Sequence, residues 1–223
     1  MSLSVAVLVS GSGSNLQALI ERVEAGALDA RIALVLSNKP EALALERARS
    51  SGIKAAALPH TAYPDRPAFD AAMVAAIREA GAEAVVMAGF MRLLTPVFIQ
   101  AFPGRIINIH PALLPSFAGA HGQRDAADYG VAISGATVHF VDEIMDHGPV
   151  VIQAAVPAYP DDDAETLGGR ILALEHRILP QAVQWLATGR LSLEGRKVRL
   201  RDAGLPKATV EGALVNPPLE QGF

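Results

Sequence analysis

The sequence predicts an α/β fold, in which a mostly parallel, twisted β-sheet is covered by helices on both faces. Short apolar stretches, often rich in β-branched residues, alternate with longer stretches of helical spacing. Hydrophobic residues make up 51% of the chain, which is enough to bury strands on both sides of a sheet. The length of 223 residues fits one domain of ordinary size or a domain with a small appendage.

The alternation is clearest in the first half of the chain. Apolar strands are expected at residues 4–9, 32–36, 55–58, 84–87 and 106–109. Helical spacing and good helix formers such as Ala, Leu and Glu mark the segments between them, residues 15–25, 40–51 and 67–80. Pro40 and Pro67 stand where the first residue of a helix is often proline. This β-α-β-α order favours a Rossmann-like parallel sheet.

The second half of the chain shows a different order of expected helices and strands. A glycine-rich loop at residues 117–122 leads to a helix expected near residues 123–129. Two further strands are expected at residues 136–141 and 149–156, joined by a polar loop at residues 142–148.

A long helix and a small C-terminal hairpin are expected to complete the fold. The helix covers residues 164–188, and Pro180 should either kink it or break it. The tail alternates from Leu191 onward, which predicts a hairpin that turns at Glu194 and Gly195.

Composition excludes several classes of function. The formal charge of -4 gives no general attraction to nucleic acid or to an anionic membrane. The absence of cysteine excludes disulfides, thiolate catalysis and cysteine-based zinc sites. The N-terminal apolar run lacks the basic region of a signal peptide, and no apolar stretch is long enough to span a bilayer. We therefore expect a soluble, cytoplasmic protein.

Asn108 and His110 form the most informative local pattern. They stand two residues apart at the end of an expected strand, so both side chains point to one face. Pro111 ends the strand because it has no N–H to donate. An amide that stabilises an oxyanion beside a histidine that moves a proton suits acyl transfer without a side-chain nucleophile. Asp146, about forty residues on, is the candidate partner that raises the pKa of the histidine.

The loop Gly11-Ser12-Gly13-Ser14-Asn15 follows the first strand and opens a helix, which suits a phosphate. It does not match the dinucleotide fingerprint, because Leu16 stands at the position of the third glycine. A single phosphate is therefore the better interpretation.

Each of these features also has a structural interpretation. The loop could be a plain strand-to-helix turn in which Ser14 or Asn15 caps the helix. Asn108 could satisfy a strand end, and His110 could be a buried, hydrogen-bonded histidine. Asp146 could only stabilise the turn before the next glycine.

The chain contains an ordered series of motifs, which include Gly-Ser-Gly-Ser-Asn, Asn-Ile-His-Pro and Asp-His-Gly-Pro. They belong to residues 7–18, 37–39, 88–94, 108–111, 121–124, 135–141 and 146–150. Through these motifs the chain resembles, from about residue 4 to residue 190, the phosphoribosylglycinamide formyltransferases, folate-dependent enzymes of purine biosynthesis.

The resemblance implies a role for each matching residue. The catalytic set is Asn108, His110 and Asp146. The residues that bind the ribonucleotide substrate are Gly13, Ser14, Asn15 and Glu175. The residues that bind folate are Arg66, Met91, Arg92, Leu93, Leu94, Asp142, Glu143, Ile144 and Met145. The resemblance also implies a single formyltransferase domain over residues 1–223. Its parts are a phosphate-binding half at about residues 1–100, a folate-binding and catalytic half at about residues 101–190, and a C-terminal tail or hairpin at about residues 191–223.

Some of these roles have simpler alternatives. Arg66 and Arg92 could be solvated surface residues, and Glu175 could be an ordinary charge on a helix surface. The family usually has proline and leucine around the glycine before His121, whereas this chain has Ala118-Gly119-Ala120. A more flexible loop is expected there.

The implied activity is transfer of the formyl group of 10-formyltetrahydrofolate to the amine of 5-phosphoribosylglycinamide, in de novo purine biosynthesis. The implied enzyme needs no metal, binds small molecules and not nucleic acid or membrane, and is a monomer or homodimer. A 10-formyltetrahydrofolate hydrolase and a non-catalytic Rossmann-like nucleotide-binding protein remain alternatives. A methionyl-tRNA formyltransferase would need a larger C-terminal domain than this tail provides.

Overall fold

The computed structural model describes residues 2–203 and 213–223 and divides into two compact units. Unit 1 is Met1–Asn108 and unit 2 is Ile109–Phe223. Strand β5 (Ile106–His110) crosses the boundary, so its last two residues belong to unit 2.

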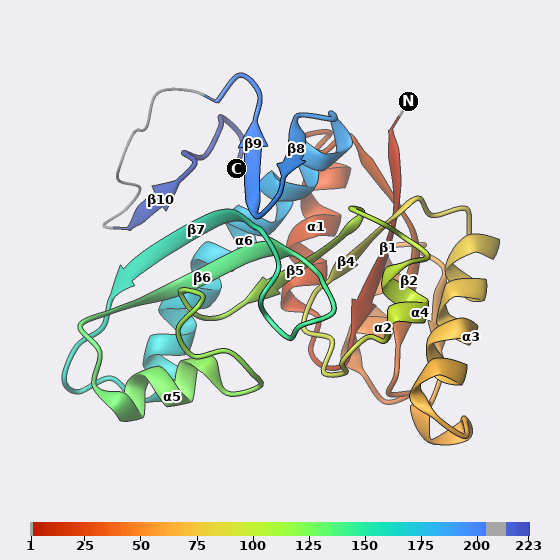
Figure 1. The fold of residues 1–223 in the computed structure, drawn as a ribbon, viewed down its shortest axis with the longest axis horizontal. Helices are drawn as coiled ribbons and strands as arrows, with labels where there is room; N and C mark the ends of the chain where they lie inside the picture. Colours follow the sequence, from red (N-terminus) through yellow and green to blue (C-terminus); the bar gives the residue numbers. More distant parts are fainter. Residues whose placement is uncertain (1, 204–212) are drawn as a thin grey trace. The chain divides into compact units, whose positions relative to one another are not determined.

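Unit 1 is built on parallel strands in the order β5-β4-β1-β2-β3. They are β1 (Leu3–Val9), β2 (Ala30–Ser37), β3 (Ala55–Ala57), β4 (Ala84–Met87) and the beginning of β5. The helices around them are α1 (Ser14–Glu24), α2 (Leu43–Ser50), α3 (Arg66–Glu79), the short α4 (Pro96–Ile99) and the 3-10 turn η1 (His60–Ala62) (Figure 1). Strands β1 and β4 are buried along their whole length, because both faces of the sheet are covered.

Unit 2 combines antiparallel strands with a long helix. The strand order is β10-β7-β6, for β10 (Leu214–Asn216), β7 (Val150–Pro157) and β6 (Ile133–Phe140). Helix α6 (Ala164–Ala187) contacts β6, β7 and helix α5 (Gly122–Tyr129). Strands β8 (Leu191–Glu194) and β9 (Lys197–Leu200) form a separate hairpin, whose strand β9 contacts β7.

The predicted fold class is confirmed: the sheet is mostly parallel, helices cover it, and a small C-terminal hairpin is present. Pro67 lies in the first turn of α3, but the helix begins at Arg66 after the N-cap Asp65, so the predicted start at Pro67 is one residue late. Pro180 lies inside a continuous α6 and does not break it.

Two further sequence predictions about local structure were wrong, and three short elements were missed. Helix α2 begins at Leu43, so Pro40 lies in the preceding turn and not at the first helical position. The β8–β9 hairpin pairs Glu194 with Lys197, so its turn residues are Gly195 and Arg196. The sequence analysis also missed α4, η1 and β10, each of which is only three or four residues long and has too few residues for a period to be visible.

Gly135 of β6 lies where the chain cannot accept a side chain. A Cβ at this position would overlap the carbonyl oxygen of Ala154 on β7. We predict that Gly135→Ala lowers the free energy of unfolding by about 2–4 kcal/mol, since strand backbone would have to move. Urea denaturation measures this loss of stability. Gly169→Ala is the matched control, because Gly169 is exposed on α6 and no atom lies near its added Cβ. This control substitution should be neutral or slightly stabilising. Equal stability of the two variants would contradict the assigned close contact.

Candidate active site

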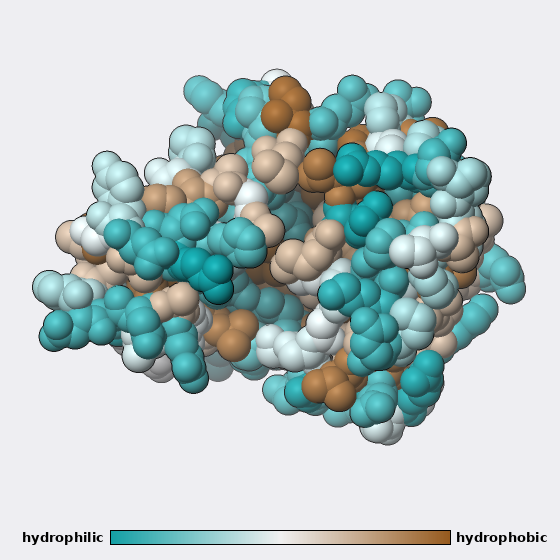
Figure 2. Space-filling model, turned by 90° about the horizontal axis from the view of Figure 1, so that it is seen from below, coloured by the Kyte–Doolittle hydropathy of each residue, from teal (hydrophilic) through white to brown (hydrophobic). Residues whose placement is uncertain are grey.

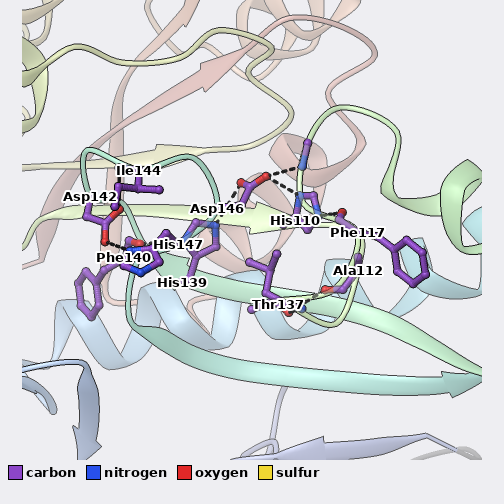
Figure 3. A network of polar contacts seen from close by, with 12 residues as sticks. His110, Ala112, Phe117, Thr137, His139, Phe140, Asp142, Ile144, Asp146 and His147 are labelled. Carbon is purple, nitrogen blue, oxygen red and sulfur yellow. Dashed lines mark hydrogen bonds and ion pairs between the residues drawn. The ribbon is translucent and has the colours of Figure 1, made fainter.

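His110 ends strand β5 in a buried position. Its side chain is only 4% exposed, and its Nε2 lies 2.8 Å from the carbonyl oxygen of Phe117. Its other ring nitrogen, Nδ1, lies 3.6 Å from Oδ2 of Asp146 (Figure 3). Asn108 is two residues earlier on the same strand and half-buried, so its side chain leaves the strand on the same face as His110.

Asp146 joins three parts of unit 2. Its Oδ2 accepts a hydrogen bond of 2.8 Å from the backbone N–H of Gly119 and faces His110, while its Oδ1 lies 3.7 Å from Nε2 of His139 (Figure 3). The carboxylate side chain is 12% exposed, and its backbone has a left-handed φ of 52°. Because such a backbone is unfavourable for a residue other than glycine, its neighbours must hold it in place.

Hydrogen bonds to the backbone show which ring nitrogen carries a proton in His110 and in His139. His110 Nε2 and His139 Nδ1 each lie 2.8 Å from a backbone carbonyl oxygen, of Phe117 and Phe140 respectively. A carbonyl oxygen can only accept, so these two nitrogens carry protons and donate them. In each ring, the nitrogen that faces Asp146 is therefore the one that gains or loses the second proton.

The electrostatic environment of His139 favours its neutral form. Burial lowers the pKa of His139, against the hydrogen bond to the Phe140 carbonyl and the charge of Asp146, which raise the pKa. The charge of His110 acts in the same direction as burial.

The loop that follows His110 is tied to strands β6 and β7. The Thr137 hydroxyl donates to the carbonyl oxygen of Ala112 at 2.7 Å and accepts from the N–H of Leu114 at 3.1 Å (Figure 3). The Gln153 amide donates to the carbonyl oxygen of Leu114 at 2.9 Å. These bonds fix the chain immediately after the catalytic candidate, which limits where the histidine ring can move.

In unit 1, the glycine-rich loop is packed tightly. Gly13 has a left-handed φ of 75°, and a Cβ there would come within 2.6 Å of the Cβ of Ala44. Arg47 Nε donates to the carbonyl oxygen of Ser12 at 2.8 Å. Gly13 is the N-cap of α1, so Ser14 and Asn15 are the first residues of the helix and not its N-cap, which the structural interpretation had placed there.

The predicted folate-binding residues of unit 1 surround the end of β4. The Ser10 hydroxyl accepts from the N–H of Met91 at 2.9 Å and donates to Asn38 Oδ1 at 2.6 Å. Met91 is 60% exposed and Leu93 is also exposed, whereas Leu94 is half-buried. Exposed apolar side chains of this size suit contact with an apolar ring.

Arg66 and Arg92 are brought into electrostatic reach of one carboxyl group, that of Asp70. Burial raises the pKa of Asp70, against its hydrogen bonds from Thr95 and the charges of the two arginines. Asp70 accepts from both the N–H and the hydroxyl of Thr95, at 2.6 and 2.7 Å. The two arginines therefore share a local environment, although they are far apart in sequence.

The predicted folate loop of unit 2 exposes two apolar side chains, Ile144 at 61% and Met145 at 52%. Asp142 accepts from the N–H of Ile144 at 3.0 Å, which closes a tight turn (Figure 3). On the face that Figure 2 shows, hydrophobic surface is divided into small areas among hydrophilic ones. The side chains of Ile144 and Met145 are accessible to a ligand.

Glu175 lies in the middle of α6 and is only 4% exposed. The alternative interpretation, an ordinary charge on a helix surface, was wrong because a surface charge would be in water. Lys, Glu, Arg and Asp are almost never this buried unless another group compensates the charge.

The sequence analysis missed the contributions of Thr137 and Gly119, whereas it expected a structural or supporting role for His139, which lies beside Asp146. Thr137 and His139 alternate along β6 and therefore share a face, a signal that was present in the sequence. Gly119 has a φ of 109°, which a glycine accommodates, and its N–H binds Asp146 despite the unusual alanines beside it.

Within residues 2–203 and 213–223, no three or more histidines and carboxylates are grouped so that they could bind a metal ion. None of the helices described there has the length and apolar character needed to cross a membrane.

Comparison with known proteins points to one family. The family model described as Formyl transferase matches residues 3–183. A phosphoribosylglycinamide formyltransferase of Escherichia coli is 39% identical over 92% of this chain and 96% of its own length. The crystal structure of glycinamide ribonucleotide transformylase 1 from Symbiobacterium toebii has a TM-score of 0.89 and 47% identity, and the match covers 90% of this chain and 95% of that chain.

Longer relatives match only in part. The trifunctional purine biosynthetic protein adenosine-3 of Drosophila pseudoobscura pseudoobscura is 47% identical over 84% of this chain, which spans 14% of the length of that relative.

Removing the hydroxyl of Thr137 tests the anchor of the loop after His110. We predict that Thr137→Val lowers the free energy of unfolding by about 1–3 kcal/mol, because it removes hydrogen bonds from buried backbone groups. Urea denaturation measures the loss. The control is Ser134→Ala on the same strand, whose buried Oγ has no partner within the described part of the chain and whose loss should be neutral. A larger loss for the control than for Thr137→Val would refute the assignment.

His139 should make stability depend on pH. Burial lowers its pKa below the unfolded value near 6.5, so between these two values the unfolded chain binds more protons. The contribution to stability is present above pH 6.5 and is lost as the pH falls. We predict that His139→Gln makes the free energy of unfolding less sensitive to pH below 6.5. Urea denaturation of both proteins across this range measures it, and parallel curves would contradict the assigned cause.

Proposed function

We propose that this chain, which belongs to the formyl transferase family and within it to the phosphoribosylglycinamide formyltransferases, transfers the formyl group of 10-formyltetrahydrofolate to the amine of 5-phosphoribosylglycinamide. The observation that carries the proposal is the pairing of His110 with Asp146, next to an amide on the same face of β5. Such a set can move protons and stabilise negative oxygen without a covalent intermediate on the protein.

The reaction begins when the neutral amine of the ribonucleotide attacks the formyl carbon. The new C–N bond produces a tetrahedral centre with a negative oxygen and a positive nitrogen. Asn108 donates its amide N–H to this oxygen, as an oxyanion-stabilising group does. The loss of one such donor typically costs about 10²–10³ in rate.

The second step moves a proton and breaks the bond to folate. The added amine loses a proton, N10 of the folate gains one, and the C–N10 bond breaks, so that formylglycinamide ribonucleotide and tetrahydrofolate leave. His110 carries this proton, directly or through water. The Asp146 carboxylate, 3.6 Å from the ring, stabilises positive charge on it and orients it.

The remaining roles concern binding. Residues Gly13, Ser14 and Asn15, at the N-terminus of α1, hold the phosphate through backbone N–H groups. Glu175 of α6 binds the hydroxyl groups of the ribonucleotide, as the matching acidic residue of the family does.

Folate is bound by apolar and charged side chains. Apolar contacts with the folate ring come from Met91, Leu93, Leu94, Ile144 and Met145, and polar ones from Arg66, Arg92, Asp142 and Glu143. The arginines suit the carboxylates of the glutamate tail. We further propose that the enzyme acts in the cytoplasm, without a metal ion, as a monomer or homodimer.

A single assay separates this proposal from its alternatives. Absorbance follows the loss of 10-formyltetrahydrofolate with and without 5-phosphoribosylglycinamide. Turnover only in the presence of the ribonucleotide supports the transferase. Equal turnover without it indicates a hydrolase that uses water, and no turnover in either case indicates a non-catalytic nucleotide-binding protein.

The role of Asp146 is tested by a substitution that preserves its size. We predict that Asp146→Asn lowers kcat by at least about 100-fold, because the charge that stabilises the protonated ring is lost. Circular dichroism and thermal melting should show a folded protein. Asp161→Asn, on a polar loop of the same unit, is the control and should keep normal turnover. Near-normal kcat in Asp146→Asn would rule out the assigned role.

A further inference from the structure

We propose that Arg196, in the turn of the β8–β9 hairpin, is a positioning residue that holds the loop carrying Asp146. The proposal rests on the proposed function for its kinetic consequence, but not for its structural one. The turn and the loop lie 49 residues apart in sequence, and nothing in the local sequence of either one requires the other.

Arg196 contacts one residue of the loop, His147, at both its backbone and its ring. Its Nη2 donates to the backbone carbonyl oxygen of His147 at 2.7 Å, and its Nη1 lies 2.8 Å from Nε2 and 3.1 Å from Nδ1 of the ring. The planar guanidinium group presents donors in a fixed fork, so one side chain can hold both the main chain and the ring.

The other side of the His147 ring is held by Asp142. Its Nδ1 lies 2.8 Å from Oδ2 of Asp142, which can only accept, so Nδ1 carries the proton (Figure 3). The Nη1 of Arg196 lies within 3.1 Å of both ring nitrogens, so the guanidinium contacts the ring as a whole and not the lone pair of one nitrogen. The ring of His147 therefore lies between a carboxylate and a guanidinium. The bond between His147 and Asp142 connects the first residue of the loop with the residue that follows Asp146.

The loop needs such an external support. Asp146 has a left-handed backbone, and its side-chain direction toward His110 depends on that backbone. Inside the loop, the N–H groups of Ile144 and His147 are bonded only within residues 142–147. Arg196 contributes a contact from outside the loop, at the peptide directly after Asp146. Release of that peptide would let the carboxylate turn away from the histidine.

The hairpin that carries Arg196 is itself anchored. Its two strands pair over four residues each, and strand β9 contacts β7, the strand that follows the loop. A side chain in its turn thus has a fixed base from which to hold the loop. Arg199, on the same hairpin, bonds instead to Glu194 at 2.9 Å and provides a matched control.

The test uses the full chain and the variants Arg196→Ala, Arg196→Lys and Arg199→Ala. We expect Arg196→Ala to lower kcat by about 10-fold or more, since a small misplacement of a catalytic group has effects of this size. The KM for the ribonucleotide should not change. Arg196→Lys should recover only part of the rate, because an ammonium group lacks the planar fork, and Arg199→Ala should behave as the wild type.

Hydrogen exchange of residues 142–148, measured without any substrate, provides the second readout. It should become faster in Arg196→Ala and stay unchanged in Arg199→Ala, at equal global stability. A double-mutant cycle with His147→Ala should be strongly non-additive in kcat.

Normal kcat in Arg196→Ala, unchanged exchange of the loop, or additive effects in the cycle would each overturn the proposal. If the wild type itself transfers no formyl group, the proposed function fails, and hydrogen exchange alone then decides whether Arg196 positions the loop.

Discussion

The position of the Asp146 carboxylate is the constraint on which the candidate site depends. One oxygen faces His110 and accepts from the N–H of Gly119, and the other faces His139. The strands β5 and β6 and the two loops that follow them thereby meet at a single charged group. In each of the two imidazoles, the nitrogen that faces away from Asp146 donates to a backbone carbonyl oxygen. The nitrogen that faces the carboxylate is therefore the one that can gain or lose a proton.

Close backbone contacts give this arrangement its rigidity. A Cβ at position 148 would overlap the carbonyl oxygen of Phe140. The backbones at the two ends of the loop therefore lie so close together that only glycine fits at this position. Thr137 and Gln153 satisfy the buried backbone groups of the loop after His110. The site is thus built on irregular chain whose polar groups are paired with neighbouring strands, which is how a loop can hold a side chain precisely enough for catalysis.

Sequence reasoning succeeded where the signal was local. Hydrophobic periodicity within a single segment predicted three elements. They are the strand that contains Asn108, the long helix α6 and the C-terminal hairpin. Contacts between distant segments could not be read in this way, as in the hydrogen bonds from Arg196 to His147. Pro40 shows the same limit, because proline suits a turn as well as a helix start and only tertiary packing decides between them.

The most direct test of the central claim is a crystal structure of the protein with 5-phosphoribosylglycinamide and a non-reactive analogue of the formyl donor. The account predicts that N10 of the analogue and the amine of the ribonucleotide lie within about 3.5 Å of the side chains of Asn108 or His110, directly or through one water. It also predicts that the Asp146 carboxylate remains beside the His110 ring. An analogue bound with its N10 far from both side chains would contradict the assignment of this site.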